Sequence, residues 1–133
     1  MLESVNPEEP LSRYILEKSY YRSSDNTVKP NAFMPPSGKN DVSVYRTASL
    51  SNEDIWQIGM TYVAQKRGMP LLGRAELIAY DAIAQGLSVK PDPVPHPRHA
   101  NISGFPIDNS AKTRMIALEL AARATLHLLK IDS

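Results

Sequence analysis

The chain has 133 residues with 11 prolines, no cysteine, and 15 basic against 14 acidic side chains. This length suits a single domain, because two separate cores would each approach the lower limit for independent folding. A net charge of +1 gives no general attraction to a polyanion, and the lack of cysteine excludes disulfides, thiol catalysis and thiolate metal ligands.

Residues 1–10 contain two prolines and three glutamates, and we expect them to form a flexible leader to a single domain over residues 11–133. This start is acidic, whereas a secretory signal begins with basic and then apolar residues. No stretch of the chain reaches the roughly 20 apolar residues that cross a bilayer. We therefore expect a cytoplasmic protein that does not bind a membrane.

Residues 11–22 interleave aromatic and basic side chains, and neither helical nor strand spacing gives them a clean apolar face. Their secondary structure stays open. Tyrosine rings can stack on unpaired bases while cations meet phosphates, and tyrosines between charged residues are also typical of protein interfaces. The candidate binding residues are Arg13, Tyr14, Lys18, Tyr20, Tyr21 and Arg22. Lys29, Lys39 and Arg46 could extend this surface.

Residues 23–41 are dense in serine, aspartate, asparagine, proline and glycine, which predicts irregular structure. The apolar residues 32–34 inside this segment should hold it to the core. Residues 42–47 then alternate β-branched and polar side chains, which predicts a strand.

Ser51 is suited to cap a helix that runs to a basic end before Gly68. Residues 74–85 predict a second, short helix, with a strand over residues 73–77 as the alternative. Gly86 should end this element.

Residues 87–90 and 98–105 both have strand-like patterns. Between them, four alternating prolines restrict the backbone of residues 91–97. We expect a stiff, ordered crossing there rather than a flexible linker.

Asn109 or Ser110 should cap a last helix that continues through Lys130, because apolar residues recur at helical spacing. The order of these elements predicts an α+β domain: a small mixed or antiparallel sheet packed by two or three helices, with long proline-rich irregular segments.

The segment of residues 92–101 holds the densest group of candidate catalytic residues. Asp92, His96 and His99 are potential metal ligands, but their spacing matches no known metal motif. We therefore predict no metal ion and no cofactor.

General acid–base chemistry needs a single histidine near neutral pKa, and His99 is the candidate. Arg46 and Arg98 would bind phosphate, while Tyr45 or Asn101 would orient the substrate. A structural role is the alternative, in which His99 and Asn101 hydrogen-bond the backbone near the prolines.

Three segments resemble a family of small bacterial cytoplasmic proteins with no activity attached to it. They are residues 28–35 (VKPNAFMP), 42–47 (VSVYRT) and 96–102 (HPRHANI). The Tyr45–Arg46 pair at the end of a strand also resembles the first core strand of ADP-ribosyltransferase-like folds. Those enzymes carry a late glutamate, and this chain shows no clear counterpart. The first resemblance implies a bacterial intracellular protein and assigns no catalytic residue.

Our first hypothesis is a non-catalytic accessory protein that docks to a larger protein or to a second copy of itself. Two features support this hypothesis: the irregular segments are unusually long, and tyrosines are interleaved with charged residues. One version of this hypothesis places the partner in a complex that handles nucleic acid. The alternative is a small enzyme acting on a nucleotide or RNA through His99, Arg46 and Arg98. A third hypothesis is a single-stranded nucleic-acid binder that uses residues 13–22.

Overall fold

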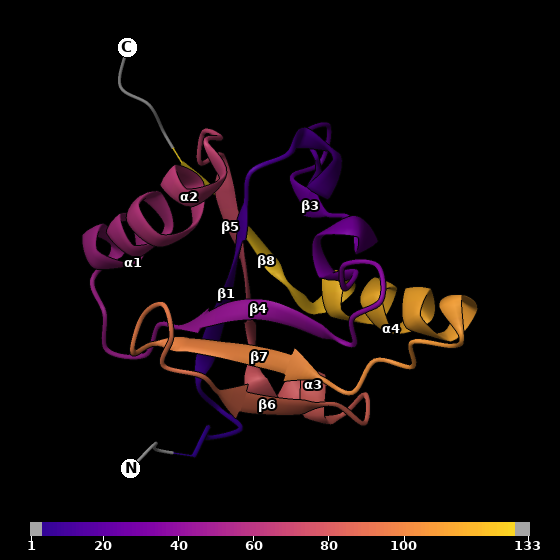
Figure 1. Cartoon of the computed structure of the whole chain (residues 1–133). Helices are drawn as coiled ribbons and strands as arrows, with labels where there is room; N and C mark the ends of the chain where they lie inside the picture. The colour runs from indigo at the N-terminus through magenta and orange to yellow at the C-terminus, as the bar shows by residue number, and fades with distance from the viewer. Residues whose placement is uncertain (1–3, 130–133) are drawn as a thin grey trace.

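The computed structural model describes residues 4–129 (Figure 1). Its centre is a six-stranded antiparallel sheet with the strand order β6-β7-β4-β1-β5-β8, and β2 and β3 form a small second sheet. The strands are β1 (Pro10–Ile15), β2 (Tyr21–Arg22), β3 (Thr27–Val28), β4 (Asp41–Arg46), β5 (Gly73–Ile78), β6 (Ser88–Pro91), β7 (His99–Ser103) and β8 (Thr125–Leu128). The protein therefore belongs to the α+β class, as the order of elements predicts.

The helical elements pack on this sheet from both sides (Figure 1). They are η1 (Lys18–Tyr20), η2 (Pro30–Phe33), α1 (Asn52–Gly59), η3 (Met60–Ala64), α2 (Gln65–Arg67), α3 (Ala79–Ile83) and α4 (Ser110–Arg123). The π-helical η3 joins α1 to α2, so these three elements form one continuous helix. No helix in the described part of the chain is long and apolar enough to cross a bilayer.

Two apolar clusters lie on opposite faces of the sheet, because successive strand side chains point to opposite sides. The larger cluster joins Val44 of β4 to Phe33 of η2 and Leu120 of α4. The smaller one joins Tyr45, the next residue of β4, to Ile58 of α1. Each face of the sheet is thus covered by a different set of helices.

The helix over residues 52–67 begins and ends where the sequence predicts. The Ser51 side chain accepts a hydrogen bond from the Asp54 N–H at 3.1 Å, and Gly68 ends the helix with a φ of 63°. A Cβ atom on Gly59 would lie 2.6 Å from the ring of Tyr14. The missing side chain therefore lets the helix approach β1 closely.

Two element predictions are wrong at the C-terminal side of the chain. Residues 74–85 do not form one helix: the alternative strand is present as β5, and only α3 follows it. The last helix ends at Arg123, and β8 follows and pairs with β5. The apolar residues that follow Arg123 continue the helical spacing of α4. Their conformation is nevertheless that of a strand, because their backbone forms hydrogen bonds with the free edge of β5. Lys130, the predicted helix end, lies outside the described residues.

Residues 23–41, for which the sequence predicts irregular structure, contain only the two-residue β3 and the short η2 before β4 begins at Asp41. Phe33 is fully buried, so the apolar island does hold the irregular segment to the core. The segment whose type stayed open contains β1, η1 and β2. Residues 6–9 form a turn closed by a hydrogen bond from the Glu9 N–H to the Asn6 carbonyl at 3.0 Å. The flexibility expected for residues 1–10 stays a prediction.

The sheet opens between β1 and β4. These strands pair only at Leu11 with Arg46 and at Ser12 with Tyr45. Beyond Ser12, β1 continues beside β5, while the other end of β4 continues beside β7. In Figure 1, β4 accordingly runs across the direction of β1. The candidate site lies where the two strands separate.

Candidate functional site

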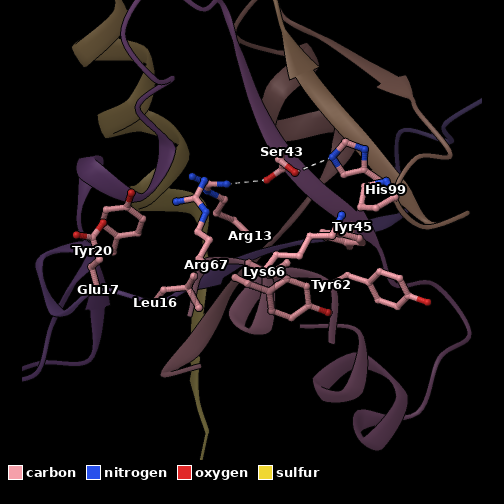
Figure 2. A pocket seen from close by; sticks show the side chains of 13 residues that line it. Arg13, Leu16, Glu17, Tyr20, Ser43, Tyr45, Tyr62, Lys66, Arg67 and His99 are labelled. Carbon is pink, nitrogen blue, oxygen red and sulfur yellow. Dashed lines mark hydrogen bonds between the residues drawn. The ribbon is translucent and has the colours of Figure 1, made fainter. Parts of the chain in front are cut away.

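A cavity of about 200 Å³ lies between the separated strands and the C-terminal half of the long helix (Figure 2). Its wall combines cations, tyrosines and a serine–histidine pair drawn from segments far apart in the sequence. The residues that matter most are Arg13, Ser43, Tyr45, Lys66, Arg67 and His99. Glu17 supplies a carboxylate to the lining.

The basic wall is built around Arg13, which lies in the gap between β1 and β4. Its Nε donates to the Ala32 carbonyl at 2.9 Å and its Nη1 to the Ser43 carbonyl at 3.0 Å. Burial lowers the pKa of Arg13, the Tyr20 hydroxyl opposes that shift, and the positive charge of Arg67 adds to it. Figure 2 shows the guanidinium groups of Arg13 and Arg67 side by side. The fold therefore brings two like charges together, one on half-buried Arg13 and one on exposed Arg67.

Lys66 and Arg67 come from the last turn of the helix, where the negative end of the helix dipole favours cations. Within residues 4–129, neither of them nor Arg13 has a carboxylate within the 4.0 Å of an ion pair. The three cations of this wall thus form no ion pair with the described part of the protein, and Glu17 is the carboxylate that shares the cavity lining with them.

Tyrosine rings form another part of the cavity lining. The rings of Tyr14 and Tyr45 are 5.5 Å apart, and the Tyr14 hydroxyl donates to the Ile55 carbonyl at 2.5 Å. Burial raises the pKa of both tyrosines, and nearby Tyr62 raises that of Tyr45 further. These two phenols stay neutral at physiological pH and are 4% and 3% exposed, whereas the lining residues Tyr20 and Tyr62 are half-buried.

His99 is 7% exposed and is held from both ring nitrogens. Its Nε2 lies 2.6 Å from the Ser43 hydroxyl, and its Nδ1 lies 2.9 Å from the Asp92 carbonyl oxygen. The Asp92 carboxylate is 3.6 Å from the same Nδ1 and accepts a hydrogen bond from the Asn101 amide at 3.3 Å. The side chains of Asn101, Asp92, His99 and Ser43 thus form a continuous series of polar contacts that ends at the cavity.

The structure does not bring all the predicted catalytic candidates into this cavity. His99 and Tyr45 line it, and Asn101 supports it through Asp92. Arg46 lies elsewhere, with its Nε 2.5 Å from the Glu9 carboxylate. Arg98 donates to the Ala48 carbonyl at 2.9 Å and lines a separate hollow.

The candidate binding residues also divide into two groups. Arg13, Tyr14 and Tyr20 line the cavity. The other three do not: Lys18 is exposed, Tyr21 packs against the larger core, and Arg22 pairs with Asp25 at 3.5 Å.

Ser43, Tyr62, Lys66 and Arg67 belong to the cavity, and sequence reasoning did not assign them to it. The alternation of residues 42–47 places Ser43 on the same face as Tyr45, which was the available signal for the serine. The basic helix end was interpreted only as a helix terminus. Its direction toward β1 depends on the packing of the whole helix.

The potential metal ligands are engaged in other bonds. His96 Nδ1 accepts from the Arg98 N–H at 3.0 Å, and both nitrogens of His99 have protein partners. Residues 4–129 contain no group of three histidine or carboxylate side chains arranged to hold a metal ion.

Comparison with protein-family models, curated proteins and solved structures gives no match. What the cavity binds is therefore inferred from its own shape and chemistry.

Proposed function

We propose that the protein binds a small phosphorylated ligand with a planar ring, of the nucleotide class, in the cavity between β1 and β4. The observation that carries this proposal is the grouping of Arg13, Lys66 and Arg67 in one cavity lining, where none of them forms an ion pair with a carboxylate of residues 4–129. The proposal keeps the nucleotide of the earlier hypothesis and replaces Arg46 and Arg98 with this wall.

An anion suits this wall for electrostatic reasons. Like charges that lie close together repel, and a bound phosphate would remove that cost. Guanidinium groups also bind phosphate oxygens through paired hydrogen bonds. Arg13 and Arg67 are therefore the expected phosphate ligands, with Lys66 adding a mobile charge.

The planar ring is supported by Tyr20 and Tyr62, the half-buried tyrosines of the cavity lining. Aromatic side chains stack on nucleobases with little regard to base identity. A neighbouring hollow of about 380 Å³ shares Arg13, Tyr20 and Arg67 with the cavity. The guanidinium groups thus stand between two spaces, which gives room for a ligand larger than phosphate alone.

Calorimetric titration with nucleoside mono- and diphosphates tests this proposal, with the matching nucleosides beside them. We expect at least one nucleotide to bind and its nucleoside to bind about tenfold or more weakly, because charge-assisted hydrogen bonds are lost. Arg67→Ala should weaken the nucleotide by a similar factor, whereas Arg114→Ala on exposed α4 is the matched control. If no nucleotide binds, or if Arg67→Ala has no effect, the proposal is wrong.

Docking to a protein partner is the second candidate function. Ile107 and Met115 are 67% and 69% exposed, and Leu118 lies one turn beyond Met115 on the outer side of α4. Exposed apolar side chains near one another favour an interface. Light scattering combined with affinity capture is the test, and a monomer that retains no macromolecule would count against docking.

A further inference from the structure

We propose that Ser43 is a nucleophile that attacks the phosphorus of an ester or anhydride bound in the cavity, with His99 as its base. This inference rests on the proposed nucleotide site and adds a reaction to it. Its starting point is the 2.6 Å separation between the Ser43 Oγ and the His99 Nε2. A serine hydroxyl is a weak nucleophile until an adjacent base removes its proton.

The hydrogen bonds of His99 determine which nitrogen carries the proton. The Asp92 carbonyl oxygen can only accept, so the Nδ1 at 2.9 Å must donate to it. In a neutral imidazole the Nε2 then has a free lone pair. The Ser43 hydroxyl therefore donates to Nε2, which is the direction that proton removal requires.

A third group orients the base. The Asp92 carboxylate lies 3.6 Å from His99 Nδ1 and is held by the Asn101 amide at 3.3 Å. A carboxylate in this place favours the imidazolium that forms when Ser43 loses its proton. The ring of Tyr45 lies 5.2 Å from the imidazole ring and limits its rotation. His99 is thus held in one orientation by side chains from β4, β6–β7 and β7.

The cations of the wall share one cavity with the Ser43 hydroxyl. Arg13 Nη1 donates to the backbone carbonyl of Ser43 at 3.0 Å, so its guanidinium is fixed to the residue that carries the nucleophile. Lys66 and Arg67 line the same cavity. Phosphoryl transfer is promoted mainly by positioning and by positive charge on the phosphoryl oxygens. This set of charges favours a phosphoric ester over an uncharged carboxylic ester.

The reaction balances without a further reactant except water. Ser43 Oγ bonds to phosphorus and its proton passes to His99 Nε2. The bond from phosphorus to the leaving oxygen breaks, and that oxygen takes the proton from His99. Water then attacks the phosphoserine, giving a proton to His99. The bond between Ser43 and phosphorus breaks, and the serine oxygen recovers the proton.

Diisopropyl fluorophosphate tests the nucleophile directly, because it labels an activated serine through loss of fluoride. The full chain is treated at pH 7.5, and labelled peptides are mapped by mass spectrometry. We expect one label, on Ser43, and none on exposed Ser88 of β6, which is the matched serine. His99→Gln should slow labelling at least about 100-fold, as for loss of a general base. Nucleotide present during the reaction should protect Ser43.

The labelling of the wild-type chain is sufficient by itself to overturn the proposal. It would do so if Ser43 were unlabelled, or if Ser43 and Ser88 were labelled equally. That comparison does not depend on whether His99→Gln folds. Nucleotide binding by calorimetry reports separately on the proposed site. Binding without labelling removes only the nucleophile, whereas labelling without nucleotide binding or protection removes the proposed ligand.

Discussion

Arginine residues that look equivalent in the sequence have different tasks in the folded protein. Arg46 lies half-buried beside Glu9, with which it pairs through two hydrogen bonds of 2.5 and 3.1 Å. Arg13 instead donates to the backbone carbonyls of Ala32 and Ser43 and interacts with the Tyr20 hydroxyl, and it has no ion pair in residues 4–129. A buried pair of this kind fixes the N-terminal segment to β4, whereas an unpaired cation beside a cavity favours an anionic ligand.

The pair between Glu9 and Arg46 predicts a pH-dependent stability. Burial raises the pKa of Glu9, but hydrogen bonds from Arg46 and the Asn6 N–H, with the charge of Arg46, lower it below its usual 4.5. A carboxyl with a lowered folded-state pKa stabilises the fold above the unfolded pKa. That stabilisation is lost as the pH falls through the folded pKa.

The measurement is urea unfolding of wild type and Glu9→Gln from pH 7 to pH 3. We expect wild type to be more stable at pH 7 and the difference to shrink below pH 4.5, the usual value of the carboxyl. Glu119→Gln, whose carboxylate is exposed in a pair of 3.6 Å with Arg123, is the control and should change little. A constant difference across this pH range would contradict the role given to Glu9.

At the scale of elements, the continuous helix over residues 52–67 both covers the smaller apolar cluster and supplies part of the cavity lining. Its N-terminal half packs Ile58 against Tyr45, and its last turn supplies Lys66 and Arg67 to the cavity. The π-helical turn between these halves changes the rotation of the residues that follow it, and such turns are frequent at functional sites. The distance of this helix from β1 therefore sets the width of the cavity.

Gly59→Ala tests this close approach. Alanine in a helix normally stabilises it by up to about 1 kcal/mol, but here the new Cβ would lie 2.6 Å from the Tyr14 ring. That ring is buried and its hydroxyl is bonded to Ile55, so it has little room to move. We expect a net loss of about 1–3 kcal/mol in the free energy of unfolding.

Urea unfolding measures the effect, and Gln65→Ala on the exposed side of the same helix is the control. An equal or greater stability of Gly59→Ala would show that the helix does not press on β1 as described.

Elements with a strong local signal could be predicted from the sequence. The strand over residues 42–47 and the helix between Ser51 and Gly68 have alternation or capping residues of their own. The two wrong predictions concern β5 and β8, whose conformation is decided by pairing with each other and with β1. Such pairing joins residues about 50 to 70 positions apart, and no local pattern contains it.

At the scale of the whole molecule, the cavity combines residues from β1, β4, β7 and a helix. His99 and Arg13 could be singled out because their residue types suggest chemistry. The sequence could not predict that these two residues line the same cavity, because this depends on where β1 and β4 separate. The net charge of +1 likewise conceals a local gathering of cations. Folding, and not composition, produces the positive wall.

The central claim is that this wall binds a nucleotide. The most direct measurement is a titration of the ¹⁵N-labelled protein with the tightest-binding nucleotide, followed by amide chemical shifts. The account predicts saturable shifts at Arg13, Ser43, Arg67 and His99, with α4 unaffected at Met115. Shifts that are confined to α4, or that do not saturate at the cavity, would contradict it.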